Sequence, residues 1–251
     1  MTEWTAIDKG STEWRKTRKL GALLGDKEDA ERRVNLAMAM FNQLERIWRQ
    51  HKVISQELRV QLFRTYVEPH FTYACGTWGQ TEQQLRWVEA QHRALLRKAI
   101  NIRYPQRIRN RALYEVTGVP PLGVTIAKAR WSLFGQVLRL DRKAPAQTAM
   151  DLYVTPPGKA GRGRPATTLP VHLHQELKDI LPEVLDTKQL KFTAATLDKL
   201  RSMANKVEHT NKNTIVYPQW EVLIQKAMTR EASMYGASIG KRVKRKRQKG
   251  C

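Results

Sequence analysis

Arginine and lysine are the residues whose type and spacing best suit a chemistry in this sequence, and that chemistry is the binding of phosphate groups. Arg86 and Arg93 are seven residues apart and Arg97 follows four later, so a helix would place them on one face. Few acids stand nearby to pair with them. Both a solvated face and a ridge that binds a phosphate backbone fit this pattern. The candidate contacts are Arg86, Arg93, Arg97, Lys98, Arg103, Arg107, Arg109 and Arg111.

Two further basic segments lie later in the chain. Arg162-Gly163-Arg164-Pro165 matches the core of an AT-hook, whose arginines enter a narrow A·T minor groove, although a solvated glycine- and proline-rich linker has the same composition. The run 241–249, with Lys244, Arg245, Lys246 and Arg247, suits a nuclear localisation signal, a phosphate-binding arm or a merely solvated end.

The residue types used in catalysis are not arranged for it. His172 and His174 stand near Glu176, but a metal site needs more donors, so we expect surface or capping histidines and no metal. The acidic cluster 26–29 suits the start of a helix. Cys75 has no evident base and is expected to be a small buried residue. The sequence therefore predicts no catalytic residues and no cofactor.

Charge dominates the composition. Forty-five lysines and arginines stand against 23 aspartates and glutamates, which gives a formal net charge of +22 and a pI near 10.3. Such a field attracts polyanions, and the alternatives to nucleic acid are an anionic membrane surface or an acidic protein. Nucleic acid is favoured because the sequence shows no lipid anchor and no strongly membrane-like helix. Two cysteines cannot form a disulfide framework, and 41% apolar residues suffice for a core. We expect an intracellular, nuclear protein without a small-molecule substrate.

Helical signals set the expected fold, which is mainly α with a short β element near the start. Asp26 could cap a first helix, Ser55 precedes a second, and Thr81 with Gln84 forms a capping box for a third. The predicted apolar stripes are Val34, Ala37, Phe41, Leu44 and Trp48, then Leu58, Leu62, Phe63, Tyr66 and Val67, then Leu85, Val88, His92, Leu95, Leu96 and Ala99.

Later helices are weaker but visible. Asn110 could cap a short helix that ends at Gly118, and a longer one follows with Leu122, Ile126, Leu133, Val137 and Leu140 as its buried face. Further helices are expected near 171–181, 193–208 and 218–237, and Trp48, Trp78 and Trp131 are expected in the core. The predicted regions are a hairpin in 1–25, a helical bundle in 26–104, a helical linker region in 105–153, a flexible linker in 154–169, a helical region in 170–238 and a basic tail in 239–251.

Several sequence blocks carry a family resemblance. The first block is Trp14-Arg15-Lys16-Thr17-Arg18-Lys19-Leu20-Gly21-Ala22-Leu23-Leu24-Gly25-Asp26, and the second is Leu62-Phe63-Arg64-Thr65-Tyr66-Val67-Glu68-Pro69 with Tyr73-Ala74-Cys75-Gly76-Thr77-Trp78. Later blocks are Arg107-Ile108-Arg109-Asn110, the segment 131–140, and Arg162-Gly163-Arg164-Pro165. Their order and spacing resemble the palm-to-thumb junction, thumb and linker of non-LTR (LINE-type) retrotransposon reverse transcriptases, over roughly residues 1–180.

The resemblance implies roles for these segments. Lys19, Leu20 and Gly21 would form a primer-grip-like turn, residues 28–101 a thumb that packs on the template–primer duplex, and residues 105–151 a linker that contacts template RNA. The family's aromatic-Ala-Asp-Asp motif does not occur in the sequence, and Gly135-Gln136-Val137 stands where the family has Gly-His-Val. The start therefore resembles a truncation inside the palm.

These observations predict a reverse transcriptase fragment that retains nucleic-acid contacts but has no polymerase activity. Its expected partners are RNA, an RNA–DNA duplex or DNA, bound through the phosphate backbone. The alternative is a structural or regulatory DNA-binding protein that uses the AT-hook-like linker and the basic tail. A pseudogene product without a selected function is also compatible with the sequence.

Overall fold

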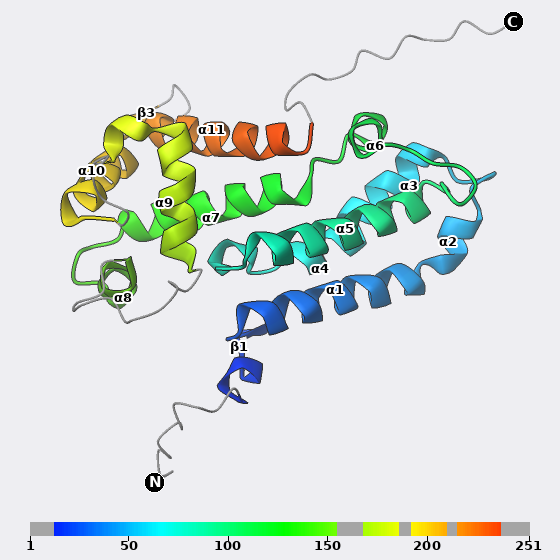
Figure 1. Cartoon of the computed structure of the whole chain (residues 1–251), viewed down its shortest axis with the longest axis horizontal. Coiled ribbons are helices and arrows are strands. Elements are labelled where there is room, and N and C mark those ends of the chain that lie inside the picture. Colours follow the sequence, from blue (N-terminus) through cyan, green and yellow to red (C-terminus); the bar gives the residue numbers. More distant parts are fainter. Residues whose placement is uncertain (1–12, 155–167, 186–191, 210–214, 237–251) are drawn as a thin grey trace, which may run out of the picture.

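The structure is a computed structural model that describes residues 13–154, 168–185, 192–209 and 215–236. It is mainly helical, as predicted (Figure 1). The α-helices are α1 (Asp26–Gln43), α2 (Glu45–Arg49), α3 (Gln56–Leu62), α4 (Glu68–Thr72), α5 (Glu82–Ala99), α6 (Asn110–Thr117), α7 (Leu122–Leu138), α8 (Pro145–Val154), α9 (Leu169–Ile180), α10 (Ala194–Asn205) and α11 (Pro218–Met234).

Short elements connect these helices. The 3-10 turns are η1 (Glu13–Lys16), η3 (Cys75–Thr77) and η4 (Pro182–Val184), and η2 (Phe63–Val67) is a π-helical turn. Strands β1 (Arg18–Lys19) and β2 (Ala22–Leu23) pair antiparallel, as do β3 (Glu208–His209) and β4 (Ile215–Val216).

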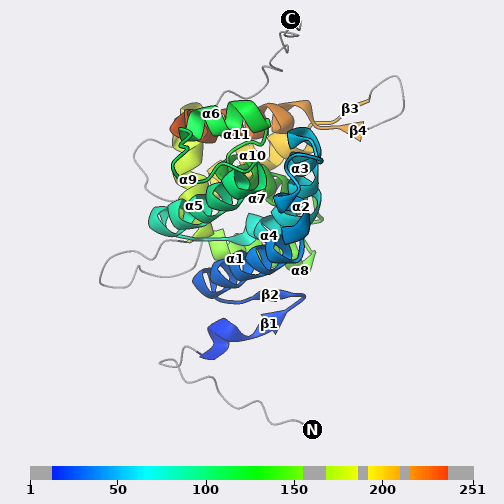
Figure 2. The ribbon, with the colours of Figure 1, turned by 90° about the vertical axis from the view of Figure 1, so that its right-hand side faces the viewer.

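The expected β element near the start is confirmed, with different bounds. The β1–β2 hairpin pairs Arg18 with Leu23 and lies beneath α1 in Figure 2. Trp14, within the region 1–25 predicted as a hairpin, lies in η1, and residues 1–12 are outside the described part of the chain.

The N-terminal core lies between α1, the continuous α3–η2–α4 segment and α5. The Thr81 capping box is confirmed, and the predicted α5 stripe faces this core. The predicted stripe after Ser55 is partly wrong, because Leu58 and Tyr66 are about half exposed and Val60 is buried. The buried face instead runs through Val60, Phe63, Val67 and Phe71, which are three, four and four residues apart, and the π turn at Phe63–Val67 lies within it.

Helix α7 lies at the centre of the molecule and contributes to two cores (Figure 1). Its start packs with the N-terminal helices, while Trp131, Phe134 and Leu138 pack with α8, α9, α10 and α11. The predicted stripe is again partly wrong, since Leu140 is about half exposed beyond the end of the helix. A helix packed on several sides has no single apolar stripe, so periodicity is a poor guide there.

The three tryptophans predicted for the core and the two predicted helix caps have different outcomes. Trp48, Trp78 and Trp131 are buried, as expected. Asp26 and Asn110 are the first residues of their helices, and the capping positions are Gly25 and Arg109, so both predicted caps are one residue off. Helix α8 and the β3–β4 pair were not predicted. No helix among the described residues is long and apolar enough to cross a membrane.

Candidate nucleic-acid interface

The basic loop, defined as residues 100–109 between α5 and α6, carries three exposed arginines and no acidic residue. Residues 90–114 contain no aspartate or glutamate, and their cations are Arg93, Arg97, Lys98, Arg103, Arg107, Arg109 and Arg111. The side chains of Arg103, Arg107 and Arg109 are exposed, as is Lys98 at the end of α5. Within the described residues none of these four forms an ion pair, so their charge is available to an outside polyanion.

The basic loop is anchored to the fold at both ends. Ile102 and Ile108 pack against the N-terminal core. Arg97 Nη2 donates to Asn110 Oδ1 at 2.5 Å and to the Ile108 carbonyl at 3.4 Å. Arg59, buried on α3, donates to the Ala99 carbonyl at 2.6 Å and so satisfies the C-terminal end of α5. These contacts hold the exposed cations at a defined edge of the bundle.

Two of the arginines predicted to form a ridge on α5 have acidic partners in the structure. The sequence suggested few acidic partners, yet Arg86 pairs with Glu82 at 2.5 Å and Arg111 pairs with Glu115 at 2.9 Å, each within one helical turn. Arg93 is mostly buried and pairs with Glu89 at 3.6 Å. The ridge therefore combines compensated charges with the free cations of the basic loop.

Glu89 is a buried carboxylate that joins three helices, and sequence reasoning missed it. It accepts hydrogen bonds from the Tyr114 hydroxyl at 2.6 Å and from the Gly123 backbone N–H at 3.0 Å. Burial raises the pKa of Glu89, against the opposing effect of those bonds and of Arg93. Its spacing from Leu85, four residues earlier, places it on the apolar side of α5, and that was the available signal.

The turn of the β1–β2 hairpin presents the three residues expected at a primer-grip-like site. Lys19 and Leu20 are exposed, and Leu20 is 95% exposed. Leu20 and Gly21 have φ angles of 46° and 84°, which suit a tight hairpin turn. The left-handed region disfavours leucine, so an unfavourable backbone conformation here displays an apolar side chain to solvent.

Side chains from two helical segments hold this turn in place. Arg32 Nη1 and Arg33 Nη2 donate to the Gly21 carbonyl at 2.8 Å and 2.5 Å. The Tyr73 hydroxyl donates to the Leu20 carbonyl at 2.7 Å. Figure 1 places the hairpin near the start of α1 and the basic loop toward the opposite end of the bundle. The 18 residues of α1 span about 27 Å, so a ligand that touches both would lie along the bundle.

The acidic residues at the start of α1 have structural partners. Asp29 is buried and accepts from the Leu23 backbone N–H at 2.9 Å and from Trp78 Nε1 at 3.1 Å. Asp26 accepts from the Gly79 backbone N–H at 3.1 Å, and burial raises its pKa. These carboxylates tie α1 to the hairpin and to the segment after η3, a role that their sequence position did not indicate.

The other candidates for chemistry are also held within the fold, and the prediction of a surface or capping position is wrong for His174, which is buried with its ring against Phe192. His172 contacts the Gln80 carbonyl, and Glu176 accepts from Trp131 Nε1 at 2.6 Å while pairing with the buried Arg130. Burial raises the pKa of the Cys75 thiol to about 11, so it is not a nucleophile at neutral pH. Across the described ranges, no three histidine, cysteine, aspartate or glutamate side chains form a potential metal site.

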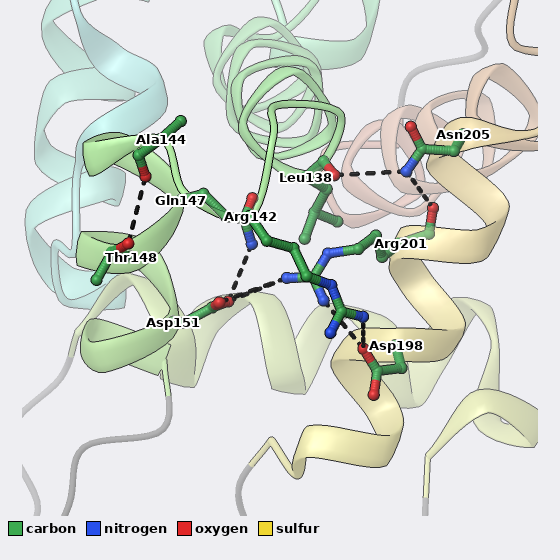
Figure 3. Close-up of polar contacts among 9 residues, drawn as sticks. All are labelled: Leu138, Arg142, Ala144, Gln147, Thr148, Asp151, Asp198, Arg201 and Asn205. Atoms are coloured by element: carbon green, nitrogen blue, oxygen red, sulfur yellow. Dashed lines mark hydrogen bonds and ion pairs between the residues drawn. The ribbon is translucent and has the colours of Figure 1, made fainter.

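A polar cluster between α8 and α10 was not predicted (Figure 3). Arg201 donates to Asp151 at 3.2 Å and to Asp198 at 2.9 Å, and Arg142 donates to Asp198 at 3.1 Å. Gln147 from α8 donates to Asp151 at 3.0 Å. Both carboxylates thus have arginine partners, and the cluster connects two helices rather than presenting a free reactive group.

A cavity of about 340 Å³ lies where α5, α7, α9 and α11 meet. Its charged lining residues are Glu82, Arg86, Arg130, Glu176, Arg230 and Glu231. Each of the three arginines pairs with one of these glutamates. The cavity therefore has little net charge to offer a phosphate.

The remaining predicted contacts cannot be placed. Arg162 and Arg164 of the AT-hook-like linker lie outside the described residues, as do Lys244, Arg245, Lys246 and Arg247 of the basic tail. Comparison of the chain with family models, curated proteins and solved structures found no match in any of the three.

Proposed function

We propose that this protein binds nucleic acid through the phosphate backbone, as the thumb and linker part of a reverse transcriptase-like chain that does not itself join nucleotides. The observation that carries the proposal is a set of four exposed cations without an ion pair to any described residue, namely Arg103, Arg107 and Arg109 of the basic loop and Lys98 at the end of α5. Like charges held close together repel one another, and a polyanion relieves that repulsion while releasing its condensed counterions.

The exposed hairpin turn supports the same proposal. Hydrogen bonds from Tyr73 to the Leu20 carbonyl and from Arg33 to the Gly21 carbonyl hold Leu20 in an unfavourable backbone conformation. Its apolar side chain is almost wholly exposed, so core packing does not explain why leucine stands here. Strained, exposed residues of this kind cluster at ligand sites. A nucleic-acid strand running along the bundle would meet this turn and the basic loop.

The lack of polymerase activity is proposed from the sequence. Two-metal nucleotidyl transfer needs aspartates that hold both ions, and the aromatic-Ala-Asp-Asp run that supplies them in the family does not occur. Metal-dependent extension of a primer above background by the purified chain would contradict this part of the proposal.

The binding site is tested with two variants of equal charge. The loop variant replaces Arg103, Arg107 and Arg109 with Gln, and the control variant replaces three exposed lysines of other helices, Lys128, Lys178 and Lys199, with Gln. We expect the loop variant to lose at least about tenfold in affinity for a 20-base-pair RNA–DNA duplex at 100 mM salt, and the control to lose clearly less. Equal losses would show that only net charge matters.

A competition experiment separates the proposal from the DNA-binding alternative. Unlabelled RNA–DNA duplex and unlabelled A·T-rich DNA duplex of the same length compete for the full chain against a labelled heteroduplex. Stronger competition by the RNA–DNA duplex supports the thumb and linker proposal. Stronger competition by the A·T-rich duplex favours the AT-hook-like linker, whose arginines read a narrow minor groove.

A further inference from the structure

Tyr104 projects from the middle of the basic loop. Its side chain is 86% exposed, which makes it the most exposed aromatic residue in the described part of the chain. The other exposed aromatics, Trp14, Tyr66, Tyr73, Trp87 and Tyr153, are all between 40% and 49% exposed. An aromatic ring left almost wholly in water contributes little to the core, and its faces are open to a ligand.

The loop that carries the Tyr104 ring is attached to the fold on both sides of it. Ile102 and Ile108 anchor the loop on either side of it, and the Gln106 backbone N–H donates to the Arg103 carbonyl at 2.8 Å. Arg103 precedes the tyrosine directly and Arg107 follows three residues later, both exposed and unpaired. The fold thus holds an open aromatic face among cations that have no carboxylate nearby.

We propose that Tyr104 is a stacking platform for an unpaired base, so that the basic loop, whose arginines contact phosphates of any strand, holds single-stranded nucleic acid more tightly than its charge alone would. The inference rests on the proposed function, because the neighbouring arginines must hold the phosphates. Base–aromatic stacking combined with a cationic track is the usual chemistry of sequence-tolerant single-strand binding. Inside a duplex both faces of each base are covered by neighbouring bases, so the ring would have nothing to stack on.

This assignment could have been suspected from the sequence. Tyr104 lies between Arg103 and Pro105 in a stretch without helical periodicity, and aromatic residues in such basic segments are candidates for stacking. RNA and DNA both offer unpaired bases with similar faces. The stacking chemistry is common to them, and a 2′-hydroxyl contact would be needed to distinguish the two.

The test uses the full chain with Tyr104→Leu and Tyr104→Phe, and Tyr66→Leu as a matched control on another exposed tyrosine. The probes are fluorescein-labelled 20-nucleotide single strands of DNA and of RNA, a blunt DNA duplex, and a DNA strand of the same length with abasic sites. We expect Tyr104→Leu to weaken binding of both base-containing single strands about tenfold, while Tyr104→Phe stays within about twofold of the unmodified chain. A loss confined to one of the two strands would identify that strand as the ligand. The control variant should bind like the unmodified chain.

The abasic strand distinguishes stacking from a general effect on the loop. It carries the same phosphates without bases, so Tyr104→Leu and the unmodified chain should bind it equally. Equal binding of both proteins to the base-containing strands, or an equal loss on the abasic strand, overturns the stacking assignment. If the unmodified chain binds single strands with strong salt dependence but Tyr104→Leu has no effect, only this inference fails. If the unmodified chain binds none of the probes, the proposed function fails with it.

Discussion

His92 on α5 gives the protein a calculable sensitivity to acid. The side chain is fully buried, and its ring meets the edges of Phe63 and Phe71, each at a centroid distance of 5.4 Å. Neither ring nitrogen has a hydrogen-bond partner. Burial, with a smaller effect from Arg93, lowers the pKa of His92 from 6.5 to about 3. The folded protein therefore keeps this histidine neutral at pH values where the unfolded chain would protonate it.

The sign of the effect follows from linkage. Between pH 6.5 and about 3 the unfolded state binds more protons at this position, so the free energy of unfolding falls as the pH falls. One pKa unit corresponds to about 1.4 kcal/mol, so the loss from this histidine is about 2 kcal/mol between pH 7 and pH 5. Below pH 5 the loss grows toward a ceiling on the order of 5 kcal/mol.

The perturbation that tests this is His92→Leu, measured by urea denaturation followed by tryptophan fluorescence at pH 7 and pH 5. Leucine removes two buried nitrogens without partners, so we expect the variant to be more stable than the unmodified chain by about 1–3 kcal/mol at pH 7. The difference in free energy of unfolding between the variant and the unmodified chain should widen by about 2 kcal/mol at pH 5. His51→Leu, at an exposed histidine, is the control and should leave the gap near zero at both pH values.

Carboxylates with raised pKa values respond in the opposite direction. Burial raises the pKa of Asp26, Glu68 and Glu89, so their contribution to the free energy of unfolding increases as the pH falls. They are present in both the unmodified chain and the variant, and the difference between the two isolates His92. A gap that is unchanged between pH 7 and pH 5 would refute the reasoning.

Two other substitutions test the hairpin turn and the buried ion pair. Asparagine suits the left-handed backbone at position 20 better than leucine does. We therefore expect Leu20→Asn to raise the melting temperature by the equivalent of about 1 kcal/mol and to lower the affinity for nucleic acid. A drop in melting temperature would contradict the strained turn. Glu176→Ala leaves Arg130 buried without a counter-charge and should lower the free energy of unfolding by about 3–5 kcal/mol in chemical denaturation. Glu82→Ala, at an exposed pair, should cost less than about 1 kcal/mol, and equal costs at the two sites would argue against the buried pair.

The helices were predictable from the sequence where one apolar face meets one core. Helix α5 is the clearest case, since its capping box begins the helix and its stripe from Val88 to Ala99 is buried as expected. The same reasoning partly failed for the α3–η2–α4 segment, where apolar residues stand on more than one side. Leu58 and Tyr66 are about half exposed although they were predicted to be buried, and the buried Val60 was not in the predicted stripe.

The charged residues were predictable as a group and not individually. An excess of cations identifies a surface for polyanions, but ion pairing depends on which carboxylates the fold brings close. Glu89 and Asp29 became buried acceptors through contacts with residues 25 and 49 positions later in the chain, and sequence spacing could not reveal those contacts. Lys98, Arg103, Arg107 and Arg109 kept their expected exposure because the basic loop has no acids beside it.

The salt dependence of nucleic-acid binding tests the central claim most directly. Affinity of the full chain for a labelled 20-nucleotide single strand is measured between 50 and 400 mM salt, on the range over which counterion release is commonly followed. Neutralisation of about four phosphates by Lys98 and the three arginines of the basic loop predicts a slope of log affinity against log salt of about −3, and replacing Arg103, Arg107 and Arg109 with Gln should reduce its magnitude by about 2. A slope near zero, or one that the loop variant leaves unchanged, would contradict phosphate binding at this surface.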